Sequence, residues 1–248
     1  MKRQQYNLGF ITDDVIFNHV KQTVKLYTTS IDLKKFNHNL IDPIKLTFDA
    51  KVYGKSFEEI IEAECVRQID KSNTNHIGYF HQNLFKHIGL GWNVPKTGFD
   101  IVNLDKHIYV ELKNKHNTMN ASSSQATYMA MQNQLLQDPK ATCLLVEVIA
   151  KKSQNIIWEG SFRGKFFSHE QIRRVSIDKF YEMVFNDKYA FKKLCIALPN
   201  ILDDVIKEES NYGNIENNVY AELADLSVDT LKSLYILAFK SYEGFDNL

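Results

Sequence analysis

The sequence predicts an α/β protein, because the spacing of its apolar residues changes from helical to strand-like and back along the chain. Apolar residues recur three and four apart up to about residue 88. They form short runs between 99 and 162 and then return to helical spacing. A length of 248 residues suits one domain with additions. We therefore expect a single domain over 1–248, with a core at about 56–162 and helical, partly basic additions at 1–55 and 163–248.

Three helices are predicted before the first strand. Thr12 can cap a helix that runs to about Tyr27, and Ser56 can cap a second that runs to about Lys71. A third helix is expected over 75–88, where apolar residues repeat at i, i+3 and i+4, and Gly89 can end it.

The pattern then changes to that of a sheet. Strands are expected at 99–104 and 108–112, joined by a turn at Asp105-Lys106. A polar loop follows over 114–120. The next helix, which Ser122 or Ser123 can cap, runs to about Leu136.

The nearly unbroken apolar run 142–149 predicts a strand covered on both faces, which a right-handed crossover places beside the earlier strands. Another strand is expected over 155–162. Ser168-x-x-Gln171 resembles a capping box that opens a helical region. The remaining chain is predicted to be mostly helical, with breaks near Asn186-Asp187, at Pro199 and around 211–213.

The composition excludes several classes of protein. With 44% hydrophobic and 24% charged residues the chain is not broadly disordered. It has no apolar run of about 18 residues, so no transmembrane helix is expected. The polar N-terminal residues do not resemble a signal peptide, and we expect a cytoplasmic protein. Three scattered cysteines are predicted to be buried, small apolar side chains in a reducing compartment: Cys65, Cys143 and Cys195.

The formal net charge is zero, but the charges are unevenly distributed. Residues 201–248 hold ten Asp and Glu residues against three lysines, a net of −7, so the first 200 residues carry +7. Residues 151–193 alone hold ten basic and five acidic residues. A basic body with an acidic C-terminal segment allows a polyanionic partner, although a solvated lysine-rich face would give the same composition.

Several common functional motifs are absent. Residues 91–97 superficially resemble a phosphate-binding loop, but Pro95 stands where a glycine is needed and a strand follows instead of a helix. No GxGxxG follows a strand, and there is no GxSxG. His76, His81 and His87 are spaced by five and six residues, which favours ordinary core or surface histidines over a metal site.

Three charged residues on two consecutive predicted strands suggest a catalytic site. Asp100 begins one predicted strand, and Glu111-Leu112-Lys113 ends the next. Residues i and i+2 of a strand share a face, so Glu111 and Lys113 point the same way while Leu112 points into the core. A hairpin would bring Asp100 close to Glu111. An exposed strand end with mixed charges is the alternative interpretation.

Two adjacent carboxylates repel each other unless a cation lies between them. Hard oxygen ligands with open positions suit Mg²⁺, which keeps several waters. Such an ion would lower the pKa of a bound water and neutralise charge on a phosphate. Lys113 could orient or help to deprotonate the attacking water and hold the phosphate by its charge. These groups suffice for in-line hydrolysis of a phosphodiester.

The segments Gly98-Phe99-Asp100 and Tyr109-Val110-Glu111-Leu112-Lys113 resemble the PD-(D/E)xK nuclease motif. Phe99 stands where the motif has proline, at a position without a chemical role. The longer stretch 110–132 (VELKNKHNTMNASSSQATYMAMQ) resembles type II restriction endonucleases that cut within GGNCC or GGWCC.

This resemblance implies a restriction-endonuclease-like core, a mixed β-sheet flanked by helices with additional N- and C-terminal helices. It also implies a homodimer that cuts double-stranded DNA with Mg²⁺, and a DNA methyltransferase as functional partner. Carried over by position, Asp100, Glu111 and Leu112 are the expected metal-binding residues, and Lys113 is the expected catalytic lysine.

Members of this fold often add a glutamate from the preceding helix. On the helix that starts at Ser56, Glu64 falls at the centre of the face that Ile60, Ile61 and Gln68 define. A carboxylate on an apolar stripe needs a partner. We expect Glu64 near the metal, and an ion-paired core glutamate is the alternative.

Contacts to DNA are expected from the end of the second strand and from the helix after it. Related nucleases place Gln and Tyr side chains of that helix toward the DNA backbone, and its N-terminus could receive a phosphate. The residues expected to contact DNA are Asn114, Lys115, Ser123, Gln125 and Tyr128. Helix capping and simple solvent exposure are the alternative roles for them.

Reading of guanine usually requires arginine, because its guanidinium can bond N7 and O6 together. Three of the five arginines lie in the basic segment beyond the core and are candidate base readers: Arg163, Arg173 and Arg174. Surface arginines on a helix are the alternative.

We therefore predict a Mg²⁺-dependent type II restriction endonuclease that cuts a GGNCC-like palindrome and leaves 5′-phosphate ends. A repair or junction nuclease of the same fold remains an alternative, as does a non-catalytic DNA-binding module.

Overall fold

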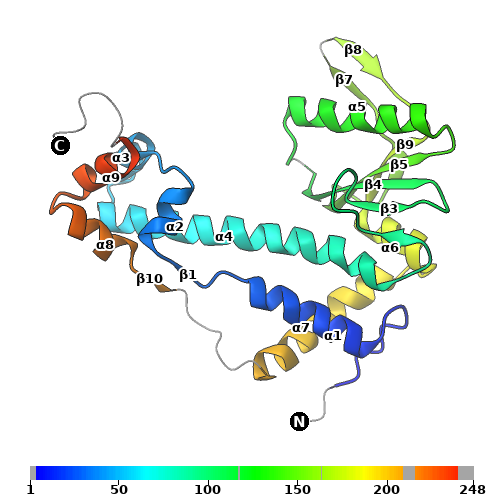
Figure 1. Ribbon diagram of the computed structural model, residues 1–248, viewed down its shortest axis with the longest axis horizontal. Helices are drawn as coiled ribbons and strands as arrows, with labels where there is room; N and C mark the ends of the chain where they lie inside the picture. The colour runs from blue at the N-terminus through cyan, green and yellow to red at the C-terminus, as the bar shows by residue number, and fades with distance from the viewer. Residues whose placement is uncertain (1–3, 117, 163, 209–215, 240–248) are drawn as a thin grey trace. The chain divides into compact units, whose positions relative to one another are not determined.

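The computed structural model of the chain describes residues 4–116, 118–162, 164–208 and 216–239 (Figure 1). The chain divides into two compact units. The sheet unit consists of Met1–Lys25 and His76–Ser210, and the helical unit consists of Leu26–Asn75 and Asn211–Leu248. The single nuclease domain expected over 1–248 stays a prediction.

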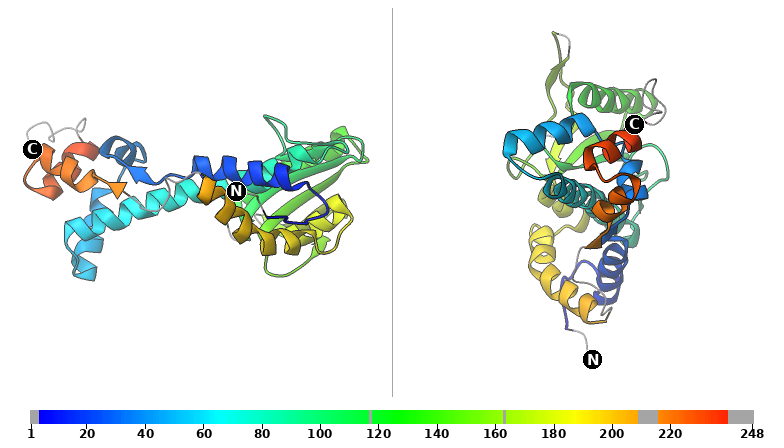
Figure 2. Two further views of the ribbon diagram at one scale, coloured as in Figure 1. Left: turned by 90° about the horizontal axis from the view of Figure 1, so that it is seen from below. Right: turned by 90° about the vertical axis from the view of Figure 1, so that its left-hand side faces the viewer.

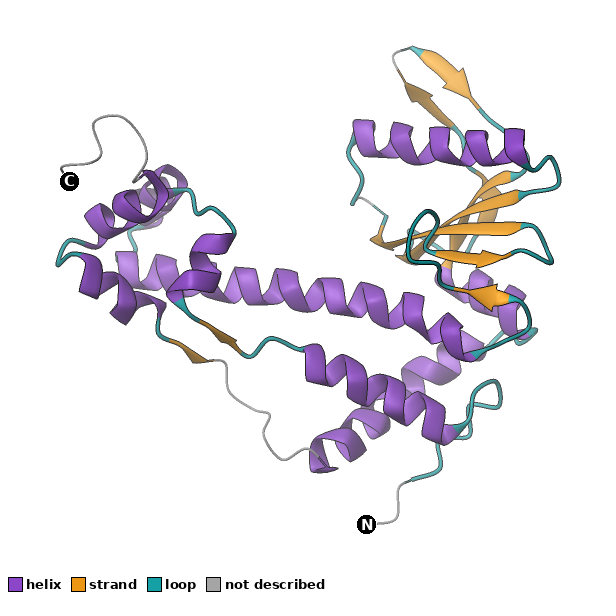
Figure 3. Ribbon diagram, in the orientation of Figure 1, coloured by secondary structure: helices purple, strands orange, loops and turns teal. Residues whose placement is uncertain are grey.

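The sheet unit is built on a six-stranded mixed sheet with the strand order β2-β3-β4-β5-β9-β6 (Figure 3). Its three central strands, β4, β5 and β9, run parallel, and the outer pairings are antiparallel. The strands are β2 (Trp92–Asn93), β3 (Ile101–Asn103), β4 (Ile108–Lys115), β5 (Thr142–Ile149), β9 (Ile172–Ser176) and β6 (Asn155–Ile157). A mixed sheet flanked by helices confirms the predicted fold class.

Two separate apolar cores cover the two faces of this sheet. On one face Tyr128 and Met131 of α5 (Ala121–Gln137) pack on Cys143 and Leu145 of β5. A short hairpin, β7 (Gly160–Phe162) and β8 (Lys165–Phe167), also adds Phe167 to this core. The other face is covered by α1 (Asp13–Leu26), the end of α4 (Phe57–Leu84), α6 (Ile177–Phe185) and α7 (Ala190–Glu208). Alternate residues of β4 therefore face different cores.

The helical unit has its own core, to which Phe36, Leu46, Ile61, Leu223 and Leu234 each contribute a fully or nearly fully buried side chain. Its helices are α2 (Leu33–His38), α3 (Pro43–Tyr53), the first part of α4, α8 (Val219–Leu226) and α9 (Thr230–Phe239). A parallel pair of short strands, β1 (Ser30–Ile31) and β10 (Glu216–Asn217), completes the described part of this unit.

The strand at 142–149 and the hairpin before it are confirmed, but the break predicted between two helices near residue 72 is wrong. Helix α4 runs without interruption from Phe57 to Leu84, and the 3₁₀ turn η1 (Phe85–His87) follows it. The polar residues at 72–74 contain neither Gly nor Pro, so nothing in them ends a helix. Asn73 instead bonds the backbone of Thr28, with its Oδ1 2.8 Å from the Thr28 nitrogen.

The helical region predicted to open at 168–171 is also wrong. Ile172–Ser176 forms β9, which pairs in parallel with β5 and buries Ile172 and Val175 completely. The sheet core therefore extends to Ser176, beyond the expected boundary near residue 162. Here tertiary pairing overrides a local capping pattern, and the helix α6 begins only at Ile177.

Two smaller expectations are corrected. Pro199 lies inside α7 and does not break it. The proline removes one helical hydrogen bond, whose acceptor would be the carbonyl of Cys195. Cys195 is exposed, so water can reach this turn, and the prediction of three buried cysteines holds only for Cys65 and Cys143. The break expected around 211–213 lies outside the described residues, and no helix in the described part is long and apolar enough to cross a membrane.

Candidate active site

The β3–β4 hairpin places the two predicted carboxylates side by side. Ile101 pairs with Val110 in the antiparallel ladder, so the preceding Asp100 comes level with Glu111. The Asp100 carboxylate accepts a hydrogen bond from the backbone nitrogen of Leu112 at 2.8 Å. Its backbone carbonyl accepts another, at 3.1 Å, from the side chain of Gln82 on α4. Asp100 is therefore fixed by hydrogen bonds from both β4 and α4.

Glu111 and Lys113 lie on the same face of β4, and the Lys113 Nζ donates to Glu111 Oε1 at 2.7 Å. Both side chains are about three-quarters buried. Burial raises the pKa of the Glu111 carboxyl, and the nearby charge of Asp100 raises it further, while Lys113 acts in the opposite direction. The structure thus brings together Asp100, Glu111 and Lys113, as the sequence predicts.

This donor set fits a hard divalent cation. No group of three or more His, Cys, Asp or Glu side chains among the described residues is arranged to hold a metal ion. Mg²⁺ nevertheless needs only one or two carboxylates, because it keeps several of its waters. The N–H and C=O of one strand residue point to the same edge, so the Leu112 carbonyl shares the edge at which its N–H meets Asp100. A cation there would also offset the repulsion that raises the Glu111 pKa.

Glu64 belongs to the helical unit, and its expected place near the metal stays a prediction. Its carboxylate accepts from Arg67 Nε at 2.6 Å and from Gln68 Nε2 at 3.0 Å, all within the helical unit. It is the ion-paired core glutamate that the sequence left open as the alternative. The α4 side chain that does contact Asp100 is Gln82. No sequence signal distinguishes Gln82 from an ordinary polar position on a helix.

Two residues at the end of β4, Asn114 and Lys115, were predicted to contact DNA, and their side chains lie on opposite faces of the strand. Lys115 shares the face of Glu111 and Lys113 and is exposed. Asn114 points to the opposite face, where its side-chain amide lies against Gly78 of α4, 3.3 Å from where a β-carbon would stand. Lys115 is therefore open to a ligand, whereas Asn114 packs against a helix, and its expected contact with DNA stays a prediction.

Helix α5 begins two or three residues earlier than predicted, and its cap is Asn120, whose Oδ1 accepts from the Ser123 nitrogen at 2.8 Å. The Ser123 side chain is exposed and Gln125 is half-buried. Tyr128 is only 1% exposed and packs on Trp158 and Phe167. The expectation that Tyr128 faces DNA is thus wrong, because its ring fills the core beneath α5.

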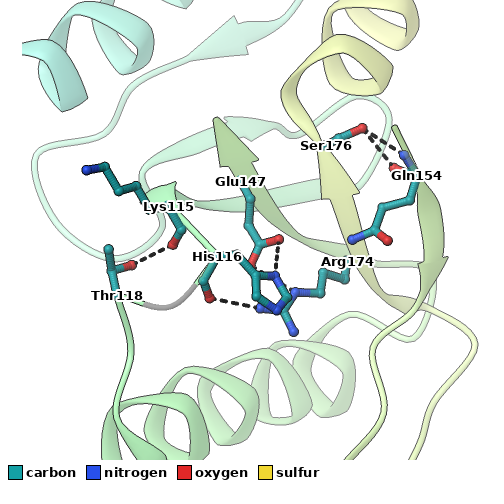
Figure 4. Close-up of polar contacts among 7 residues, drawn as sticks. All are labelled: Lys115, His116, Thr118, Glu147, Gln154, Arg174 and Ser176. Atoms are coloured by element: carbon teal, nitrogen blue, oxygen red, sulfur yellow. Dashed lines mark hydrogen bonds and ion pairs between the residues drawn. The ribbon is translucent and has the colours of Figure 1, made fainter. Parts of the chain in front are cut away.

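Arg174 forms an internal ion pair, and its expected role as a base reader stays a prediction (Figure 4). Its guanidinium bonds the carboxylate of Glu147, with Nε 2.9 Å from Oε1, and also the carbonyl of His116 at 3.3 Å. The other Glu147 oxygen lies 3.0 Å from His116 Nδ1. Glu147 is completely buried and is the β5 neighbour of Lys113. A lone acid in the apolar run 142–149 was the sequence signal for this cluster.

Arg173 lies on the opposite face of β9 and is also engaged. Its Nε donates to Asn155 Oδ1 at 2.6 Å and its Nη2 to the Asn155 carbonyl at 2.8 Å, which holds β6 at the sheet edge. Arg163 lies outside the described residues, so its assignment as a base reader stays a prediction.

The sequence of the chain is similar to those of known restriction endonucleases. A family model described as Eco47II restriction endonuclease matches residues 8–207. The type II restriction enzyme Sau96I of Staphylococcus aureus is 34% identical over 228 residues, which cover 87% of each chain. The type II restriction enzyme Eco47II of Escherichia coli is 29% identical over 216 residues, 81% of this chain and 89% of the relative.

These matches confirm the prediction of a type II restriction endonuclease, a site-specific deoxyribonuclease that binds DNA. Enzymes of this class generally use a divalent metal ion. The chain belongs to the Eco47II restriction endonuclease family.

Proposed function

We propose that the chain hydrolyses phosphodiester bonds in both strands of DNA at a GGNCC-like palindrome, with Mg²⁺ as its metal, and leaves 5′-phosphate ends. The observation that carries this proposal is the convergence of Asp100, Glu111 and Lys113 at one end of the hairpin. The resemblance of residues 110–132 to enzymes that cut GGNCC or GGWCC supports the choice of site.

The residues of the chain have separate roles in this mechanism. Asp100 and Glu111 supply carboxylate oxygens and Leu112 a backbone carbonyl as the ligands of Mg²⁺. The bound ion supplies charge neutralisation at the phosphate and a water of lowered pKa. Lys113 orients the attacking water and holds a phosphate oxygen by its charge. Its ion pair with Glu111 holds the ammonium group beside a carboxylate that would bind the metal, so the group is in place before DNA binds.

Glu111 is kept partly out of water, and this has a chemical consequence. The raised pKa of its carboxyl means that the carboxylate is held less favourably than in water. A cation therefore relieves an existing cost when it binds, which favours metal uptake at neutral pH and opposes it in acid. We expect cleavage to fall as Glu111 takes up a proton.

For DNA contacts we propose Lys115 and Ser123, which are exposed, together with the half-buried Gln125. Lysine and the N-terminal turn of a helix suit phosphate groups, which position DNA without reading its sequence. Base reading remains with residues not yet assigned, among which Arg163 stays a candidate.

We further propose that the enzyme works as a homodimer in the cytoplasm. A palindromic site presents two equivalent strands, and a two-fold protein offers one active site to each. A DNA methyltransferase that modifies the same sequence would be the functional partner, since unmodified host DNA would otherwise be cut.

The test is digestion of a sequenced phage DNA with Mg²⁺, followed by sequencing of the fragment ends. The proposal predicts discrete fragments whose ends share one GGNCC-like palindrome and carry 5′-phosphates, and no fragments from a Glu111→Gln variant. Cutting at branched or damaged sites alone would favour a repair or junction nuclease. Binding of DNA without any cutting in Mg²⁺ would favour a non-catalytic module.

A further inference from the structure

Helix α3 of the helical unit is apolar on two opposite faces. Leu46 and Ala50 face the core and are only 3% and 4% exposed. On the other side Ile44, Phe48 and Val52 are 55%, 66% and 72% exposed. We call these three residues the α3 stripe. A helix with only one apolar face would have polar residues at these positions.

The α3 stripe is continuous, because its members are spaced at i, i+4 and i+8. At 100° per residue they span an arc of about 80°, centred about 180° from Leu46 and Ala50. Figure 2 shows α3, in light blue, at the outer edge of its unit in both views. A helix that is apolar on both sides is usually buried on both sides. Within the described residues, the stripe is open to solvent.

We propose that the α3 stripe is the surface through which a second copy of this chain binds, with the two α3 helices antiparallel about a two-fold axis near Phe48. The inference rests on the proposed function, in which a dimer offers one active site to each strand of a palindrome. It adds which surface forms that dimer.

The spacing of the stripe makes it complementary to itself. Ile44 and Val52 stand equally far from Phe48, so a reversed copy places each of them opposite the other. An isologous interface has this property, in which one patch serves both partners.

The charges beside the stripe are also self-complementary. Lys45 and Asp49 form an ion pair along one side of the stripe. In a reversed copy centred on Phe48, Asp49 comes within about 3 Å, along the helix axis, of the second copy's Lys45. Along the axis the order is then Lys45, the second copy's Asp49, Asp49 and the second copy's Lys45. Each lysine thus neighbours an aspartate of the other copy, and the two aspartates lie between the two lysines.

The apolar area is that of an interface centre. One aromatic and two aliphatic side chains at these exposures offer on the order of 300 Å². A standard interface needs about 800 Å² from each partner, with an apolar centre and a polar rim. The remainder must come from the surface around α3.

The test measures mass in solution without DNA. The chain weighs 28.8 kDa, so sedimentation equilibrium separates monomer from dimer. Wild type is expected to be a dimer. Phe48→Glu, which places a charge at the axis in both copies, is expected to weaken dimerisation by about 100-fold or more. Val228→Glu alters a fully exposed apolar residue of the same unit and serves as the matched control, which should remain a dimer.

A charge exchange tests the arrangement itself. Lys45→Glu alone should weaken the dimer, and adding Asp49→Lys should restore it, because the reversed pair is again complementary. Far-ultraviolet circular dichroism must show unchanged helix content in every variant. A Phe48→Glu variant that remains as dimeric as wild type would overturn the proposal.

The main rival occupant is the chain's own C-terminal residues 240–248. If they cover the stripe, wild type and Phe48→Glu have the same mass and only a chain lacking 240–248 associates, which also overturns the proposal. DNA cleavage is measured separately. If the chain dimerises through α3 but never cuts DNA, the proposed function alone is refuted. If the chain cuts DNA and its dimer is unchanged by Phe48→Glu, only this interface is refuted.

Discussion

Replacing Arg174 separates a structural role from a role in reading DNA. The side chain bonds Glu147, which is completely buried, and the carbonyl of His116. Arg174→Ala removes the positive partner and leaves a buried carboxylate with only His116 beside it. Breaking one half of a buried ion pair costs about 3–5 kcal/mol. Because the His116 ring still bonds the second Glu147 oxygen at 3.0 Å, we expect a loss near the lower end, about 3 kcal/mol.

Urea unfolding at pH 7 measures this loss. With a denaturant slope of about 2–3 kcal/mol per M, a 3 kcal/mol change lowers the midpoint by about 1 M or more. Arg173→Ala is the matched control, since Arg173 is the neighbouring arginine on the opposite face and bonds only Asn155 and a carbonyl. We expect it to change stability by less than about 1 kcal/mol. A double variant, Glu147→Leu with Arg174→Met, should recover much of the loss, because it leaves no charge buried.

The reasoning is refuted if Arg174→Ala unfolds at the wild-type midpoint. If it also loses preference for its DNA site while remaining folded, Arg174 is a base reader, and the contact with Glu147 is incidental.

Three further predictions follow from the site and the core. Glu64→Ala should retain cleavage within about threefold while Glu111→Ala abolishes it, and equal loss in both variants would return Glu64 to the metal site. Tyr128→Phe should leave cleavage unchanged and stability equal or higher, since the buried hydroxyl has no partner among the described residues; a drop in DNA affinity would contradict this. Burial lowers the pKa of His81 from 6.5 to about 4. As the pH falls from 6.5 to 4, His81 therefore binds a proton in the unfolded chain but not in the folded chain, and the free energy of unfolding should fall by roughly 3 kcal/mol. In His81→Phe, urea midpoints should fall less over that range, and an identical pH dependence would exclude His81 as a cause.

The candidate site was largely predictable because its geometry is local. Asp100 and Glu111 belong to adjacent strands joined by a tight turn, and residues two apart on a strand share a face. The positions of Asp100, Glu111 and Lys113 therefore depend on one hairpin, which the pattern of apolar residues indicates directly.

What could not be predicted depends on partners distant in the sequence. Ile172–Ser176 becomes a strand only because β5 pairs with it, and the local sequence favours a cap. Arg174 lies in a basic segment that suggested DNA, and its partner Glu147 is 27 residues away.

The central claim is that Lys113 acts in the chemical step beside Asp100 and Glu111. The most direct measurement compares wild type and Lys113→Ala on one DNA duplex with a GGNCC site, using single-turnover cleavage in Mg²⁺ and binding with Ca²⁺ in its place. We predict a cleavage rate lower by about 10³-fold or more, with binding affinity changed by less than about threefold. Cleavage at the wild-type rate, or a loss fully explained by weaker binding, would contradict the account.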